Sequence, residues 1–87
     1  MKEYTIISRR FRYGGDVRES RTTGTLEYLI KYFGYTLECG KSWEHERGNK
    51  KINLNPKTAR SLVTNLNNAK SNSAANGCPS EWYELAE

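Results

Sequence analysis

Residues 55–77, NPKTARSLVTNLNNAKSNSAANG, have the features of one long helix with both ends marked. Asn55 is a residue type that caps helices by accepting hydrogen bonds from the first free backbone amides. Pro56 would then occupy the first helical position, where its missing N–H costs nothing and its fixed φ suits the helix. Asn76-Gly77 supplies a left-handed stop. The sequence therefore predicts one long helix over residues 55–77.

The same stretch is amphipathic. Apolar or small residues recur at steps of three and four, which gives one narrow stripe: Ala59, Leu62, Val63, Leu66, Ala69 and Ser73. The opposite face is polar: Lys57, Arg60, Thr64, Asn65, Asn67, Asn68 and Lys70. Because a helix of this kind must bury its stripe, the rest of the chain has to supply a surface for it.

Residues 3–13, EYTIISRRFRY, are rich in β-branched and aromatic residues and predict a strand. Gly14-Gly15-Asp16 predicts a tight hairpin turn, since glycine accepts positive φ. Residues 17–22 would return as a second, more polar strand. Near the C-terminus, residues 80–85, SEWYEL, predict a last strand with Trp82 and Glu84 on one face and Tyr83 and Leu85 on the other.

Between the hairpin and the long helix, Thr25 is positioned to cap a first helix that Gly40 would end. Gly34 lies inside this helix, where we expect it to mark close packing, and a break there is the alternative. If the chain breaks, residues 35–39 and 42–46 would form a second hairpin. The expected core face has helical spacing: Leu26, Leu29, Ile30, Phe33 and Leu37.

The predicted order is therefore strand, strand, helix, helix, strand in a single domain, residues 1–87. The simplest architecture is a two-layer α+β fold: a three-stranded antiparallel sheet with both helices on one face. The first and last strands would pair, and the other sheet face would be open to solvent. Residues 41–54 form a long polar connection that Trp43, Ile52 and Leu54 would hold against the body.

Composition describes a small intracellular domain. Of 87 residues, 36% are hydrophobic and 28% are charged, with a formal net charge of +4. The first residues, MKEYTIISRR, lack the apolar run of a signal peptide, and no stretch is long enough to span a membrane. Cys39 and Cys78 are expected to be reduced thiols, which fits a cytoplasmic location. The basic balance suits an acidic partner, including nucleic acid.

The strongest candidate binding site is the N-terminal hairpin. Five arginines lie within thirteen residues, interleaved with aromatic side chains: Arg9, Arg10, Arg12, Arg18 and Arg21, with Phe11 and Tyr13. Arginine offers a planar fork for phosphate or carboxylate, and aromatic rings can stack on bases. In the alternative interpretation these arginines pair across strands with Glu19, Glu81 and Glu84 on a solvated sheet face.

Two further features favour a binding protein. The connecting loop carries Lys41, Arg47, Lys50 and Lys51, and we include Lys50 and Lys51 in the candidate contact surface. Tyr28, Tyr32 and Tyr35 fall outside the expected core face, and tyrosine and arginine are enriched where proteins meet. The alternatives are an ordinary solvated loop, whose charge Glu44 and Glu46 dilute, and tyrosine hydroxyls that only meet water.

Nothing in the sequence predicts catalysis, a cofactor or a metal site. His45 is the single histidine, and neither cysteine lies close enough in sequence to form a ligand set or a catalytic pair with it. The chain has no glycine-rich phosphate loop, zinc-finger spacing or RNA-recognition signature. We therefore expect a protein without enzymatic activity.

The chain resembles the small accessory proteins of tailed bacteriophages. The resemblance spans residues 35–85 and rests on YTLECGKSWE, the NPKTARSLVTNLNNA helix and the terminal SEWYEL strand. It implies a viral protein of the host cytoplasm that binds and inhibits a host enzyme or an anti-phage defence complex. Inhibitors of this kind that mimic DNA are strongly acidic, whereas this chain is basic.

The resulting expectation is a phage-type, non-enzymatic inhibitor that acts by direct protein–protein contact in host–virus conflict. The alternative is a small basic nucleic-acid-binding protein that uses the same hairpin. We expect no membrane association. An exposed last strand would also offer an edge for pairing with another chain, so a homodimer is a further option.

Overall fold

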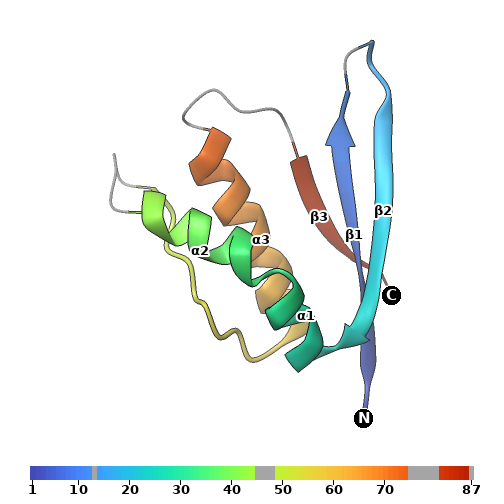
Figure 1. Ribbon diagram of the computed structural model, residues 1–87, viewed down its shortest axis with the longest axis vertical. Helices are drawn as coiled ribbons and strands as arrows, with labels where there is room; N and C mark the ends of the chain where they lie inside the picture. Colours follow the sequence, from blue (N-terminus) through green and yellow to red (C-terminus); the bar gives the residue numbers. More distant parts are fainter. Residues whose placement is uncertain (13, 45–48, 75–80, 87) are drawn as a thin grey trace.

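A computed structural model describes residues 1–12, 14–44, 49–74 and 81–86 (Figure 1). Three strands form one antiparallel sheet in the order β2-β1-β3, and the helices lie on one side of it. The fold is therefore the two-layer α+β domain that the sequence predicts. The elements are β1 (Glu3–Phe11), β2 (Val17–Thr25), α1 (Leu26–Tyr32), α2 (Gly34–Trp43), α3 (Ala59–Ala74) and β3 (Glu81–Ala86).

The β1–β2 hairpin turns at two glycines in the left-handed region. Gly14 and Gly15 have φ of 94° and 89°, which explains why the turn needs glycine. The Arg12 N–H donates to the Asp16 carbonyl at 2.8 Å and closes the turn. The register pairs Glu3 with Thr25 and Phe11 with Val17, so β2 is three residues longer than the sequence pattern predicted. The polar composition of β2 gave no indication that the strand continues to Thr25.

The predicted first helix is two helices. Thr25 caps α1 as expected, because its side chain accepts from the Tyr28 N–H. The helix then breaks at Phe33, which has φ −94° and ψ 8°, and continues as α2. Helical structure runs on to Trp43, so the alternative hairpin over residues 35–46 is wrong for the residues that the structure describes.

The two glycines in this region have different roles from those predicted. We expected close packing at Gly34, but a Cβ there would meet nothing within 4 Å. We expected Gly40 to end the helix, but it is buried inside α2, where an added Cβ would approach the Ala69 Cβ to 2.2 Å. Gly40 therefore allows α2 and α3 to approach closely, which sequence spacing alone does not reveal.

Helix α3 begins later than predicted, at Ala59. The cap is Thr58 rather than Asn55: the Thr58 Oγ1 accepts from the Ser61 N–H at 3.0 Å, and the Thr58 carbonyl accepts from the Leu62 N–H. Asn55 instead donates its N–H to the Asn53 side chain in a local turn. Threonine and asparagine are both good caps, so composition could not choose between them. The predicted stop at Asn76-Gly77 lies outside the described residues.

The core lies between the sheet and the three helices. Its buried members come from all elements except β2: Ile6, Leu29, Phe33, Leu37, Ile52, Leu62, Leu66, Ala69 and Tyr83. The predicted core face of α1 and α2 is confirmed, as is the predicted stripe of α3 apart from Ser73, which is only half-buried; Leu26, Ile30 and Val63 pack at the margin. Tyr83 and Leu85 face this core from β3, as the alternation predicted.

Buried asparagines were not predicted. Asn65 and Asn72 on α3 are only 8% and 2% exposed. Each side chain bonds the backbone of the connection that precedes the helix: Asn65 accepts from the Asn53 N–H, and Asn72 accepts from the Lys50 N–H and donates to the Lys50 carbonyl. These bonds satisfy buried polar groups on both sides and fasten the connection to α3. The placement of Asn65 on the solvent face was wrong.

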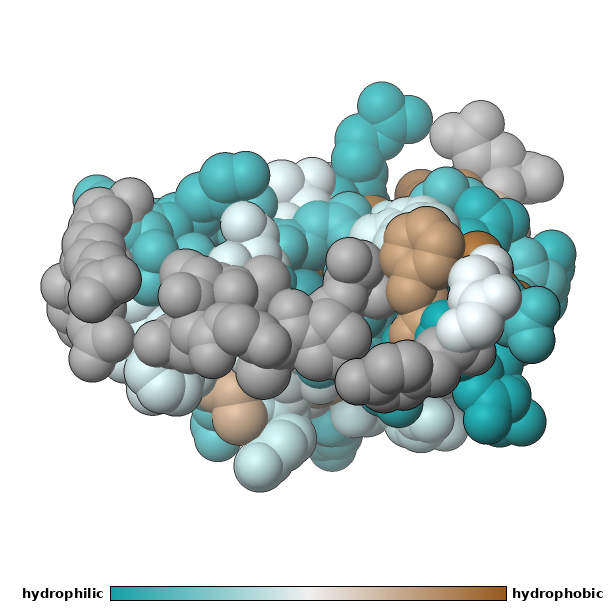
Figure 2. Space-filling model, turned by 90° about the horizontal axis from the view of Figure 1, so that it is seen from above, coloured by the Kyte–Doolittle hydropathy of each residue, from teal (hydrophilic) through white to brown (hydrophobic). Residues whose placement is uncertain are grey.

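No helix in the described parts of the chain is long and apolar enough to cross a membrane. Seen from the turn end of the hairpin, the coloured surface is mostly hydrophilic, and hydrophobic residues occupy small patches (Figure 2).

Candidate binding surface

The strand register divides the hairpin arginines between two faces of the sheet. Arg9 lies opposite Glu19, and Arg10 lies opposite Arg18. Successive side chains of a strand point to opposite faces, so Arg9 and Arg21 belong to the open face while Arg10 and Arg18 belong to the helical face. Arg12 continues the row of Arg10 at the end of the hairpin. The predicted site is therefore two separate arrangements with different chemistry.

On the open face, arginine and glutamate neutralise one another. The Arg9 guanidinium bonds the Glu19 carboxylate, with its Nη2 3.0 Å from Oε1, and also pairs with Glu84. Arg21 reaches the other oxygen of Glu19 at 3.4 Å. The hydrogen bond from Arg9 lowers the pKa of Glu19 and, reciprocally, raises that of Arg9. The cross-strand interpretation is confirmed for this half of the hairpin.

An aromatic pair continues the open face toward the turn. The ring centroids of Phe11 and Trp82 are 5.3 Å apart, although Phe11 is 47% exposed. Beneath the ion pairs, Ile7 is only 6% exposed because the long charged side chains beside it cover it.

On the helical face, the hairpin extends past the helices and leaves a hollow of about 360 Å³. Arg10 and Arg18 face each other across the two strands, and Ser8 and Ser20 form the next pair. Glu81 and the strand position of Glu19 complete the lining, although the Glu19 carboxylate itself pairs with Arg9 on the open face. In Figure 1 the turn end of the hairpin projects beyond the helices, and Arg10 and Arg18 are both exposed.

Glu81 is already engaged. Its carboxylate lies 3.2 Å from the Lys70 Nζ and 3.5 Å from the Arg10 Nη2, and it accepts from the hydroxyls of Ser8 and Tyr83. Burial raises the pKa of Glu81, but the attraction of Lys70 and Arg10 outweighs it, and the net pKa lies below the ordinary value. Burial, with the adjacent charge of Glu81, raises the pKa of Tyr83. Glu81 is therefore ionised at neutral pH.

The positive charge of the helical face exceeds what Glu81 can balance. Within the described residues, Arg12 and Arg18 form no ion pair, and Arg10 shares its single carboxylate with Lys70. We call Arg10, Arg12 and Arg18 the arginine triad. Arg10 and Arg18 are like charges in directly opposite positions of an antiparallel pair, an arrangement that destabilises the free protein.

The structure does not join every predicted site residue to this surface. Lys50 and Lys51 are exposed on the connection that precedes α3, on the side of the helices away from the hairpin (Figure 1). Lys41 pairs with Glu44 at 2.9 Å. Tyr13 and Arg47 lie outside the described residues. The loop lysines are thus a separate basic region.

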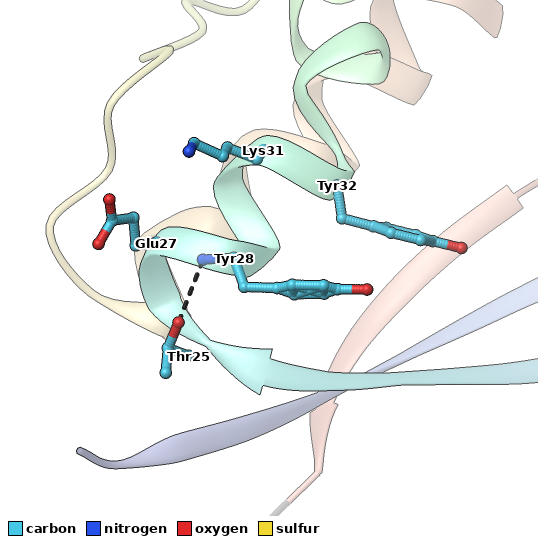
Figure 3. A pocket seen from close by; sticks show the side chains of 5 residues that line it. All are labelled: Thr25, Glu27, Tyr28, Lys31 and Tyr32. Carbon is cyan, nitrogen blue, oxygen red and sulfur yellow. Dashed lines mark hydrogen bonds between the residues drawn. The ribbon is translucent and has the colours of Figure 1, made fainter.

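The outward tyrosines are confirmed, and they line a groove that the sequence did not indicate. Tyr28, Tyr32 and Tyr35 are 45%, 58% and 80% exposed. A groove of about 510 Å³ runs beside α1, lined by Thr25, Glu27, Tyr28, Lys31 and Tyr32. In Figure 3 the rings of Tyr28 and Tyr32 point the same way, and Glu27 and Lys31 point away from them.

The described residues contain no group of histidine, cysteine, aspartate and glutamate side chains that could hold a metal ion. Cys39 is a free, half-buried thiol. Comparison with known proteins found no matching family model, no matching curated protein and no matching solved structure.

Proposed function

We propose that this chain is a non-enzymatic binding protein that uses the arginine triad to contact an acidic surface of a partner protein. The observation that supports the proposal is the direct opposition of Arg10 and Arg18, of which Arg10 alone reaches a carboxylate, that of Glu81, which it shares with Lys70. An acidic partner would relieve this repulsion. Guanidinium groups are well suited to it, because they bind carboxylates through paired hydrogen bonds.

The nature of the partner follows from the resemblance to the small accessory proteins of tailed bacteriophages. On that basis the partner is a host enzyme or an anti-phage defence factor, which the chain inhibits by occupying its surface. The chain would then act in the cytoplasm of the infected cell as a stoichiometric inhibitor.

A second candidate is nucleic-acid binding through the same triad. The observation in its favour is that the triad groups lie along one face of a projecting hairpin, where consecutive phosphates could reach them. Binding of this kind would weaken steeply as salt increases, because phosphate contacts release counterions.

One experiment separates the two candidates. Tagged protein is incubated with bacterial lysate, with and without nuclease treatment, and retained proteins are quantified by mass spectrometry. A defined protein that is retained equally under both conditions is the expected result. Retention that disappears after nuclease treatment, together with salt-sensitive binding to short DNA or RNA, would contradict the protein-binding proposal and favour the second candidate.

A further inference from the structure

The two edges of the sheet differ in how accessible their backbones are. At the β3 edge, the Asn67 side chain from α3 bonds both backbone groups of Tyr83: Nδ2 donates to the carbonyl at 3.0 Å, and Oδ1 accepts from the N–H at 2.7 Å. The amide thus takes the place that a neighbouring strand would occupy. The last strand is therefore blocked at its centre, although the sequence suggested it as the edge for pairing.

These two bonds also establish where the backbone groups of β2 point. In an antiparallel sheet, the N–H and C=O of one residue point to the same side, and the side alternates along the strand. Because the groups of Tyr83 point away from β1, those of Ser8 opposite it point toward β2. The backbone N–H and C=O of Ser20, which lies opposite Ser8, then point back toward β1. The outward groups of β2 belong to its odd-numbered residues: Val17, Glu19, Arg21 and Thr23.

These four residues are all exposed, and β2 contains no proline that would protect the edge. The odd-numbered side chains also share the open face, where Glu19 and Arg21 lie on either side of Ser20. Opposite charges placed symmetrically about one residue are complementary to a second copy of the same strand.

We propose that a second copy of this chain adds its β2 to β2 in antiparallel orientation, about a two-fold axis through Ser20. Glu19 then lies directly opposite Arg21 of the second copy, and Val17 lies opposite its Thr23. Each such pair exchanges two backbone hydrogen bonds, because both members point their groups outward. The result is a six-stranded sheet that carries both helical layers on one side.

Charge selects this register over its neighbours. When a two-fold axis perpendicular to the sheet relates the two copies, residues that lie opposite each other must have their side chains on the same face. The axis therefore passes through a residue position and not between two residues. An axis at Glu19 would place the two copies of Glu19 opposite each other. An axis at Arg18 or Arg21 would likewise place two arginines opposite each other, and each of these like-charge pairs is unfavourable. With the axis at Ser20, Arg18 meets Thr22 of the second copy. Both arginine triads then lie on the helical side of one continuous sheet.

Cysteine cross-linking reads this register directly. In a Cys39→Ser, Cys78→Ser background, Ser20→Cys places two thiols opposite each other in a non-hydrogen-bonded pair, with Cβ atoms about 4.5–5.5 Å apart and a disulfide within reach after a small shift. Thr22→Cys is the matched control on the same face. Its two copies would be separated by four strand positions, about 13 Å. We expect mild oxidation to give a covalent dimer for Ser20→Cys and little for Thr22→Cys.

Charge exchange supplies a second test in the protein without added cysteines. Arg21→Glu keeps the Arg9–Glu19 pair but opposes glutamates across the axis, so sedimentation should show a lower dimer fraction. Glu19→Arg/Arg21→Glu exchanges the two charges and should restore the dimer; because Arg9 then faces an arginine across the strands, thermal unfolding checks that this variant is folded. Equal cross-linking at residues 20 and 22 would overturn the register. A wild-type protein that remains monomeric over the whole concentration series, with no cross-link at residue 20, would overturn the dimer itself.

Discussion

Gly40 of α2 lies directly against Ala69 of α3, at a separation that leaves no room for a side chain. A Cβ built on Gly40 would be 2.2 Å from the Ala69 Cβ and 2.5 Å from its Cα. The distance to the backbone atom matters most, because a backbone cannot rotate away as a flexible side chain can. The spacing of α2 and α3 therefore depends on this glycine.

Gly40→Ala should accordingly destabilise the protein. Overpacking of a filled interior costs about 1–3 kcal/mol in free energy of unfolding. Gly34→Ala is the matched control, since an added Cβ there meets nothing within 4 Å and should give up to about 1 kcal/mol of stabilisation by restricting the unfolded chain. Urea unfolding of both variants measures the difference. Equal effects of the two substitutions would show that the helices do not pack at Gly40.

Asn67→Ala should destabilise the protein at the edge of β3. It removes both hydrogen bonds to the Tyr83 backbone, each worth about 0.5–1.5 kcal/mol. Asn68→Ala, one position along the same helix, is the control and should change stability by no more than about 0.5 kcal/mol. Hydrogen exchange at the Tyr83 amide gives the local measurement. Unchanged protection of that amide in Asn67→Ala would refute the bond.

Thr58→Ala tests where α3 begins. Loss of the N-cap hydrogen bond to Ser61 should destabilise the protein by about 1 kcal/mol. Asn55→Ala, at the position that the sequence suggested for the cap, should have a much smaller effect on thermal unfolding. A larger loss of stability in Asn55→Ala than in Thr58→Ala would place the start of the helix at Asn55.

Stability should fall in acid through Glu81. Its folded-state pKa lies below the ordinary carboxyl value of 4.5, so the unfolded chain binds the proton more readily. The stabilisation by the ionised carboxylate is therefore complete at pH values above the ordinary carboxyl pKa. It is lost as the pH decreases from that pKa to the folded-state pKa and below. Glu81→Gln should be less stable than wild type at pH 7, and the difference should shrink at about pH 3. A difference that is independent of pH would mean that Lys70 and Arg10 do not stabilise the carboxylate.

The sequence predicted the elements of this fold better than their ends. Period-two alternation identified both faces of β1 and the inward side of Tyr83, because strand geometry is local. The end of β2 depended on the pairing register with β1. The start of α3 depended on the choice between Asn55 and Thr58 as the cap. Tertiary packing decides both. Gly34 and Gly40 look alike in sequence, and only the approach of Ala69 distinguishes them.

The binding surface was predicted as a region but not as an arrangement. The count of arginines identified the hairpin, yet the division into a neutralised open face and the arginine triad depends on which residues face each other across β1 and β2. Two further features had no sequence signal beyond exposure and polarity. They are the groove beside Tyr28 and Tyr32 and the hydrogen bonds of the Asn67 side chain to the Tyr83 backbone. The Asn67–Tyr83 contact joins residues distant in the chain, whereas the groove is lined by residues of α1 and its cap alone.

Arg18→Glu gives the most direct test of the proposed binding surface. Arg18 forms no ion pair in the described structure, and glutamate at this position would face Arg10 as an opposite charge, so thermal stability should be unchanged or slightly higher. Lys57→Glu makes the same change in net charge away from the hairpin. In capture from nuclease-treated lysate, we expect Arg18→Glu to lose the partner protein by tenfold or more and Lys57→Glu to retain it. Equal retention by both folded variants would contradict the account.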